Sequence, residues 1–212
     1  MKVIAINGSP RKSWNTAKLL EKALEGASSS GAETEIINLY DIDYKGCKSC
    51  FACKRHTASY GRCCVNDDLR PVLEKIEQAD VLILGSPVYF RNISGAMMSF
   101  TERFLFPKMI YTNPMTSINK SKLKVASIFT MNGKEQTFNQ LPLKQHLEGI
   151  TGTLKTIFGN SAVLYSFFTY QTDNYTGMEY TYFDIDEKKA YHENRFPLDC
   201  EKAFELGKQL TV

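Results

Sequence analysis

The N-terminal segment joins a buried strand to a polar loop and a helix, and this constrains the fold more than any other feature. Residues 3–6 form a short apolar run, typical of a parallel strand that is covered on both faces. Asn7-Gly8-Ser9-Pro10 ends that run with turn-forming residues. A helical pattern follows, with apolar residues three and four positions apart at Leu20, Ala23, Leu24 and Ala27. The segment therefore predicts a strand–loop–helix unit of an α/β sheet.

The loop after this strand (residues 8–16, the first loop) carries the donors that a phosphate group needs. A helix N-terminus offers free backbone N–H groups and the positive end of the helix dipole. Beside it lie the hydroxyls of Ser9, Ser13 and Thr16, the amide of Asn15 and the guanidinium of Arg11. The alternative is an ordinary solvated turn. The loop contains neither G-x-G-x-x-G nor G-x-x-x-x-G-K-[ST], which disfavours a Rossmann dinucleotide site and a nucleoside triphosphatase.

Strand and helix patterns alternate along the rest of the chain. We expect further strands over residues 34–39, 81–84, 124–130 and 161–169. Helical patterns lie between them, and a last helix, interrupted at Pro197, reaches the C-terminus. The alternation predicts one doubly wound α/β/α domain over residues 1–212, with a five-stranded parallel sheet in the order 2-1-3-4-5.

Composition narrows the classes of partner. The 212 residues suffice for a sizeable core, and a net charge of +3 with 23% charged residues gives no reason to expect nucleic acid or a membrane. No apolar stretch approaches the ~18 residues that span a bilayer, and the run before Asn7 is too short for a signal peptide. We therefore expect a cytoplasmic protein whose six cysteines are reduced unless they bind metal or do redox work.

The first loop resembles that of the flavodoxin-like NAD(P)H-dependent FMN reductase family, which commonly reads G-S-P-R-K-x-x-N-T. The matching residues are Gly8, Ser9, Pro10, Arg11, Lys12, Asn15 and Thr16, whereas Trp14 stands where small residues are frequent. Residues 85–94 (the second loop) are similar to the family's S-P-V-Y-F-G-N-x-S, with Arg91 in place of the glycine. The resemblance implies a flavodoxin-like fold, FMN as cofactor, and NADPH or NADH as electron donor.

The resemblance also implies which residues surround the flavin. Ligands of doubly wound sheets bind at the carboxyl ends of the strands, where the first and second loops meet. In the second loop we expect Pro87, Val88, Tyr89, Phe90 and Asn92 to contact the flavin, although an aromatic loop that merely covers the core is the alternative. A weaker match follows the fourth strand at Thr130, Met131 and Asn132, which we also expect at the flavin.

These features predict an FMN-dependent NAD(P)H oxidoreductase of the flavin, quinone or azo type. The chain shows no Ser/His/Asp arrangement, so we expect no catalytic side chain, because FMN supplies the hydride chemistry. A non-enzymatic electron carrier and a zinc-stabilised binding module remain the competing classes. Family members are typically dimers or dimers of dimers. An apolar surplus also favours a homodimer or homotetramer, at Phe100, Phe104, Leu105, Phe106, Met109, Ile110 and Tyr111.

The cysteines leave an alternative open. Cys47, Cys50 and Cys53 form C-x2-C-x2-C, and Cys63 and Cys64 follow. Four thiolates could hold a 4Fe–4S cluster or zinc, and iron–sulfur flavoproteins of this superfamily carry a compact cysteine motif here. Their fourth cysteine usually comes sooner, and nothing in residues 54–62 forces Cys63 back to the other three. We therefore expect reduced thiols without metal, with residues 47–64 as a lid near the cleft or a subunit contact.

Overall fold

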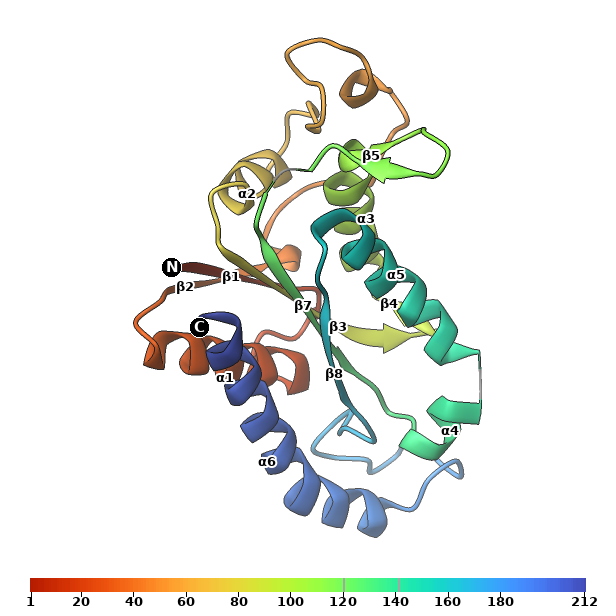
Figure 1. Ribbon diagram of the computed structural model, residues 1–212. Coiled ribbons are helices and arrows are strands. Elements are labelled where there is room, and N and C mark those ends of the chain that lie inside the picture. The colour runs from red at the N-terminus through yellow and green to blue at the C-terminus, as the bar shows by residue number, and fades with distance from the viewer. Residues whose placement is uncertain (120, 141) are drawn as a thin grey trace.

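A five-stranded parallel sheet forms the centre of the molecule (Figure 1). The structure is a computed structural model that describes residues 1–119, 121–140 and 142–212. The spatial order is β2-β1-β3-β7-β8, with bounds Glu33–Asn38, Lys2–Asn7, Val81–Tyr89, Lys124–Thr130 and Ala162–Ser166. Every neighbouring pair among these five strands is parallel. In chain order this is 2-1-3-4-5, so the predicted fold class is confirmed.

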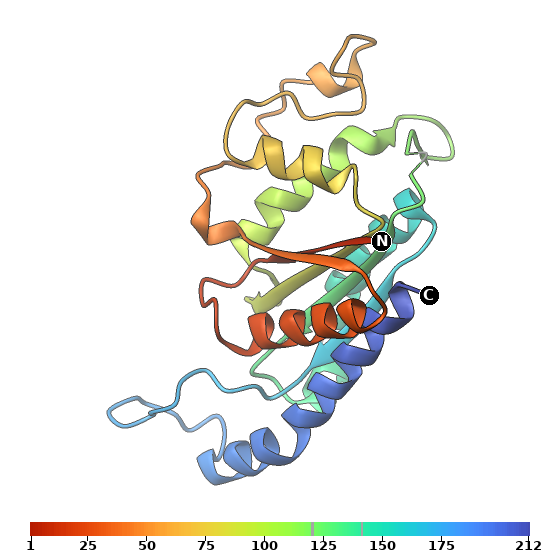
Figure 2. The same ribbon diagram turned by 90° about the vertical axis from the view of Figure 1, so that its left-hand side faces the viewer.

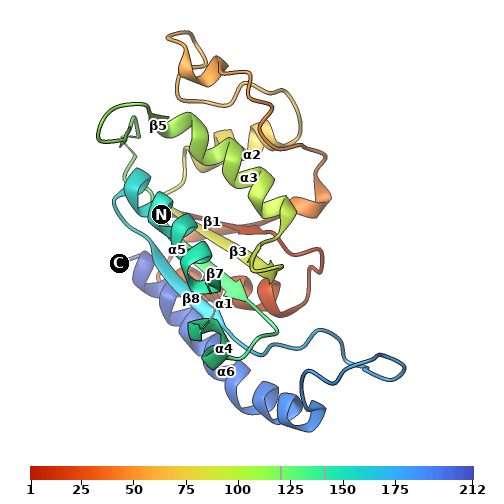
Figure 3. The same ribbon diagram turned by 90° about the vertical axis from the view of Figure 1, so that its right-hand side faces the viewer.

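Helices cover both faces of the sheet. One face carries α1 (Asn15–Ser29) and α6 (Ile185–Leu210), and the other carries α2 (Leu69–Ile76), α3 (Gly95–Leu105) and α5 (Leu143–Phe158), as Figures 2 and 3 show. Because side chains alternate along a strand, Ile4 and Ile6 of β1 enter the core beneath α2, α3 and α5. Val3 and Ala5 enter the core beneath α1 and α6.

Several short elements lie outside this framework. The two-residue strand β4 (Asn92–Ile93) folds back antiparallel on β3. Strands β5 (Met109–Ile110) and β6 (Thr116–Ser117) pair in a small hairpin, and α4 (Glu135–Gln140) precedes α5. Strand and helix periodicity cannot reveal elements of two residues, so the sequence does not predict these strands.

The predicted interruption of the last helix at Pro197 is wrong, because α6 runs unbroken from Ile185 to Leu210. Tertiary contacts on both sides of the proline hold the helix. Phe196 is buried in the core, and the Asp199 carboxylate accepts a 2.7 Å hydrogen bond from the Ser166 hydroxyl of β8. These contacts offset the one backbone hydrogen bond that a proline removes.

Most of the apolar residues that the sequence analysis counted as a surplus around α3 are buried or half-buried. Phe100, Phe104 and Leu105 are buried in the core, and Phe104 stacks on Phe158 with ring centroids 5.5 Å apart. Of the predicted surplus, Tyr111 alone is classed as exposed. The surplus is therefore a weaker argument for an oligomer than the sequence suggests.

The fifth strand is shorter than expected, ending at Ser166. The chain then turns toward the loop after β7, where the Phe168 N–H donates to the Gly133 carbonyl at 2.9 Å and Thr169 N–H to the Met131 carbonyl at 3.0 Å. No helix among the described residues has both the length and the apolar character needed to cross a membrane.

Candidate functional site

The carboxyl ends of the central strands open into one pocket with about 430 Å³ of space for ligand and solvent. The sequence-predicted residues that line it are Ser9, Arg11, Asn15, Thr16, Pro87, Val88, Tyr89, Thr130, Met131 and Asn132. Three loops far apart in the chain therefore meet at one site, which we call the flavin pocket.

The first loop presents an anion-binding surface to this pocket. Helix α1 begins at Asn15, and its N-cap Trp14 makes no side-chain capping bond, which leaves first-turn N–H groups free to bind a ligand. The polar side chains of Ser9, Asn15 and Thr16 are buried around this helix end. The Thr16 and Thr130 hydroxyls are 2.7 Å apart, so a direct hydrogen bond joins the first loop to the loop after β7. This donor set fits the phosphate of FMN.

Buried polar contacts hold the first loop in place. The Asn7 side chain accepts from the Ser9 N–H at 3.0 Å and donates to Asn38 at 2.9 Å. Gly8 donates to the Gly85 carbonyl at 2.8 Å and accepts from the Ser94 hydroxyl at 2.6 Å. A Cβ at Gly8 would lie 2.9 Å from Met97 Cβ, so only glycine fits between the two loops. The first and second loops are thus locked together.

The segment after β8 closes one side of the flavin pocket. Backbone carbonyls of Tyr170 and Gln171 accept hydrogen bonds from three side chains of the first loop. Trp14 Nε1 and Asn15 Nδ2 donate to Tyr170 at 3.0 and 2.6 Å, and Arg11 donates to Gln171. Two of the predicted phosphate donors, Arg11 and Asn15, therefore also anchor residues 170–171.

Three predicted residues do not line the flavin pocket. Ser13 is exposed on the first loop. Phe90 is fully exposed, because Phe90 and Arg91 adopt left-handed backbone angles, with φ of 48° and 66°, where β3 reverses into β4. Asn92 uses its side-chain oxygen to accept from the Ile93 N–H at 2.8 Å. Phe90 and Asn92 therefore lie outside the wall of the flavin pocket, and their contacts with the flavin stay a prediction.

Four residues line the flavin pocket that were not among the predicted site residues: Trp14, Thr169, Tyr170 and Gln171. Trp14 departs from the small residues that are frequent at this position of the family's first loop. Its ring centroid lies 4.7 Å from the Arg11 guanidinium carbon, in a cation–π contact. Residues 169–171 follow the last parallel strand, so the rule that ligands bind at carboxyl ends of strands could have found them.

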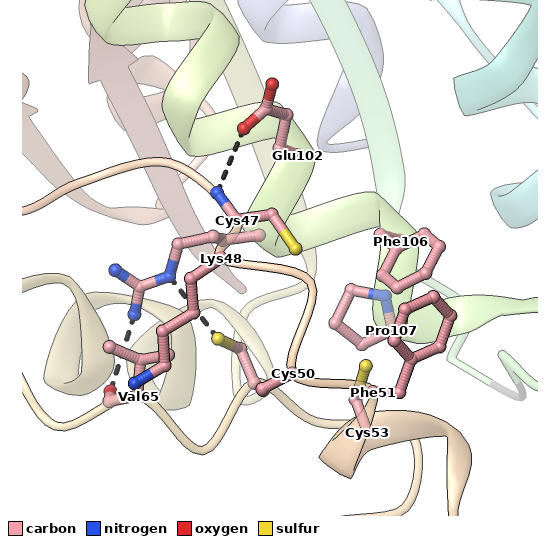
Figure 4. A pocket seen from close by; sticks show the side chains of 11 residues that line it. Cys47, Lys48, Cys50, Phe51, Cys53, Val65, Glu102, Phe106 and Pro107 are labelled. Atoms are coloured by element: carbon pink, nitrogen blue, oxygen red, sulfur yellow. Dashed lines mark hydrogen bonds between the residues drawn. The ribbon is translucent and has the colours of Figure 1, made fainter.

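The cysteines line a second, smaller pocket beside the C-terminal end of α3. Cys47, Cys50, Cys53 and Cys63 contribute to it (the cysteine pocket), and apolar walls come from Phe51, Val65, Phe106 and Pro107. Figure 4 shows Cys47 and Cys53 on either side of the space, with the Cys47 N–H bonded to Glu102 at 2.9 Å. Burial raises the pKa of the Cys53 thiol.

The expectation that nothing returns Cys63 to the other cysteines is wrong. The Arg103 side chain of α3 is fully buried, and it donates to Cys63 Sγ at 3.3 Å, Asp67 Oδ1 at 2.9 Å and the Lys45 carbonyl at 3.1 Å. Gly61, with φ of 78°, donates to the Cys53 carbonyl at 2.9 Å and closes the nine-residue loop. Arg103 is a single arginine on an apolar helix, and this was the sequence signal that could have indicated the contact with Cys63.

No residue of the segment 47–64 lines the flavin pocket, so the segment does not form the predicted lid over it within this chain. The alternative, a subunit contact, stays a prediction. No three His, Cys, Asp or Glu side chains of the described residues could hold one metal ion together. All six cysteines are free thiols. An iron–sulfur cluster bonds its thiolates at separate iron atoms, so cysteines spread around a cavity fit a cluster better than a zinc ion.

Comparisons with known proteins agree with this geometry. An iron–sulfur flavoprotein of Archaeoglobus fulgidus is 42% identical over 109 residues, which are 51% of each chain. YwqN of Bacillus subtilis, named as a suspected NAD(P)H-dependent FMN-containing oxidoreductase, is 30% identical over 152 residues, 71% of this chain and 77% of that protein. The chain spans about half the length of the iron–sulfur flavoproteins that it matches.

Among solved structures, the NAD(P)H:quinone oxidoreductase from Methanothermobacter marburgensis shares the fold, with a TM-score of 0.73 at 14% identity over 99% of this chain and 98% of that one. The sequence profile described as NADPH-dependent FMN reductase matches residues 1–150. This match covers well over half of the chain, and the donor set of the first loop fits its cofactor. The chain therefore belongs to the NADPH-dependent FMN reductase family.

Proposed function

We propose that the chain transfers hydride from NADPH or NADH to FMN held in the flavin pocket and passes the electrons to a small electron-poor acceptor. The observation that carries the proposal is the convergence of three loops on one pocket, with Thr16 bonded directly to Thr130. A quinone or an azo compound is the acceptor class that we favour. The names of structures with the same fold, a quinone oxidoreductase and azoreductases, support this choice.

Different residues of the flavin pocket would bind the phosphate and the ring system of FMN. The hydroxyls of Ser9 and Thr16, with the N–H groups at the start of α1, would hold the phosphate. Tyr89 and Met131 would flank the ring, and the Asn132 amide would bond its polar edge. When bound, FMN supplies the hydride-accepting centre, and the protein supplies orientation and electrostatics. Trp14 and residues 170–171, which are joined by a hydrogen bond, would cover the phosphate and keep water from it.

The purified chain tests this proposal. Released cofactor should run as FMN on chromatography, and the holoenzyme should oxidise NADPH or NADH steadily in the presence of a quinone or an azo dye. Thr16→Val removes a buried hydroxyl at the wall of the flavin pocket and should weaken FMN binding, while Ser13→Ala, at an exposed position outside the pocket, should not. FAD at full occupancy, or no oxidation of either nicotinamide, would contradict the proposal.

A second candidate is an iron–sulfur flavoprotein with a 4Fe–4S cluster on Cys47, Cys50, Cys53 and Cys63. The cysteine pocket and the printed names of several relatives favour it over the prediction of metal-free thiols. Iron and sulfide analysis of anaerobically purified protein distinguishes the cluster from metal-free thiols. About four iron and four sulfide per chain, lost in Cys53→Ser, would support the cluster. Flavin without iron would support the metal-free alternative.

We also propose a homodimer or homotetramer in the cytoplasm. The fully exposed Phe90, beside the pocket residue Tyr89, offers an apolar contact for a second copy. Light scattering that gives the 24.1 kDa of a single chain at micromolar concentration would contradict the oligomer.

A further inference from the structure

Lys188 of α6 is a buried cation that no part of the described function uses. Its side chain has no exposed surface, and among the described residues no carboxylate lies within ion-pair distance of its ammonium. Instead, Nζ donates to Asn132 Oδ1 at 2.5 Å and to the Phe168 carbonyl at 3.3 Å. It also lies over the Phe168 and Phe183 rings, at 4.1 and 4.8 Å from their centroids. Burying a cation without a counter-charge is costly, so this arrangement calls for a reason.

The hydrogen bond to Asn132 gives a reason for burying this cation. An ammonium group can only donate hydrogen bonds, so the Asn132 amide must turn its oxygen toward Lys188 and its NH₂ group away from it. Asn132 lines the flavin pocket, and in the described part of the chain no protein acceptor takes its NH₂ hydrogens. Lys188 thus sets Asn132 as a hydrogen-bond donor at the pocket wall, and its positive charge lies directly behind that donor.

We propose that Lys188 is a positioning residue of the flavin pocket, which holds the Asn132 amide as a donor and favours reduced over oxidised FMN through its charge. The inference rests on the proposed function. A reduced flavin carries more negative charge on its ring system than an oxidised one, and it gains more from an oriented donor backed by a cation. The low dielectric around a fully buried ammonium strengthens this effect.

The surroundings of Lys188 make the effect depend on pH. Burial, and to a smaller extent the charge of Lys134, lower the pKa of Lys188 to about 8. Lys134 is paired with Glu187 at 2.6 Å, and the Asp184 carboxylate accepts from the Glu187 N–H at 2.8 Å, so both carboxylates are engaged elsewhere. His192, one turn further along α6, has its own pKa lowered by burial. Above pH 8, Lys188 therefore loses its charge and its preference for reduced FMN.

The midpoint potential of bound FMN, followed from pH 6.5 to 9.5, tests the proposal. Lys188→Met keeps the length and apolar contacts of the side chain but removes the charge and the donor. It should lower the affinity for reduced relative to oxidised FMN about tenfold at pH 7, which corresponds to about 30 mV for a two-electron couple. Lys188→Arg should keep the potential at pH 7 but lose the inflection near pH 8 that the unaltered enzyme shows.

Lys189→Met is the matched control, because Lys189 is exposed on the same helix and should leave the potential and its pH dependence unchanged. Identical potentials in the Lys188→Met and Lys189→Met variants would overturn the proposal. If Lys188→Met fails to fold, the comparison of the unaltered enzyme with Lys188→Arg still tests the inference. The inference is contradicted if the unaltered enzyme shows no inflection of the potential near pH 8. It is also contradicted if Lys188→Arg shows the same inflection. Failure of the unaltered chain to bind FMN would instead contradict the proposed function.

Discussion

At the scale of single residues, two buried cations do different work. Arg103 is paired with Asp67 and touches Cys63, so its charge is balanced and it fastens the cysteine loop to α3. Lys188 has a side-chain amide, a carbonyl and two aromatic rings around it. The sequence offers a signal for Arg103, which is a single arginine on an apolar helix, but it marks Lys188 as an ordinary charged residue. Burial of Lys188 depends on residues that are distant in the chain, so this position could not be singled out before the fold was known.

The Arg103–Asp67 pair gives a prediction of stability. Arg103→Met should lower the free energy of unfolding by about 3 kcal/mol, because it leaves a partly buried carboxylate without its partner. Urea denaturation measures this change. Arg70→Met removes an exposed pair with Glu74 and should change stability by about 0.5 kcal/mol or less. Equal effects of the two substitutions would show that the Arg103 pair does not secure the loop.

The same pair predicts how stability depends on pH. Burial acts to raise the pKa of Asp67, but the hydrogen bond and charge of Arg103 outweigh it and hold that pKa below its ordinary value. The stabilisation is therefore fully present above the pKa of an unfolded aspartate, about 4, and is lost as the pH falls through the folded value. In Arg103→Met, unfolding measured between pH 3 and 5 should show less of this dependence.

At the scale of elements, the tightest contact joins α1 to α6, whose sequences lie at opposite ends of the chain. A Cβ at Gly207 would overlap the Ala23 carbonyl, and one at Gly26 would overlap the Phe204 carbonyl. The helical periodicity of both segments is visible in the sequence, but their close crossing is not. Likewise, the sequence predicts that Pro197 interrupts α6, whereas packing of Phe196 and Asp199 keeps the helix continuous.

Two glycine substitutions should therefore have opposite signs. Gly207→Ala should reduce the free energy of unfolding by about 2 kcal/mol, because the backbones of α1 and α6 must move apart. Gly149→Ala, on α5 with nothing near its missing Cβ, should stabilise by about 0.5–1 kcal/mol through helix propensity. Thermal unfolding of both variants gives the comparison. A stabilising Gly207→Ala would mean that the two helices are less tightly packed than described.

At the scale of the whole molecule, the flavin pocket and the cysteine pocket are separate sites. The first lies at the carboxyl ends of the strands, and the second lies beside the end of α3. Mutational effects at sites without shared partners usually add. The two pockets can therefore be altered one at a time, and each can be measured without disturbing the other.

Arg11→Ala tests this independence. The loss of a charged donor, worth ~1.5–3 kcal/mol, and of the anchor for residues 170–171 should weaken FMN binding at least about tenfold. Lys12→Ala is the control, because Lys12 lies in the same loop as Arg11 and forms an exposed ion pair with Asp41. This substitution should have little effect on the dissociation constant of FMN. In the double variant with Arg103→Met, the loss of FMN affinity and the loss of stability should each match the single variants. Strong non-additivity would show that the pockets are coupled.

The sequence by itself determined the order of the sheet, and it predicted the first loop and most of the residues that line the flavin pocket. These features depend on local periodicity, on turn-forming residues and on the rule that parallel strands end at one edge. Only the tertiary structure decided that Phe90 faces solvent, that Cys63 returns to the other cysteines and that Lys188 lies behind Asn132. Each of these depends on a backbone reversal or on a contact between distant segments, which no local pattern encodes.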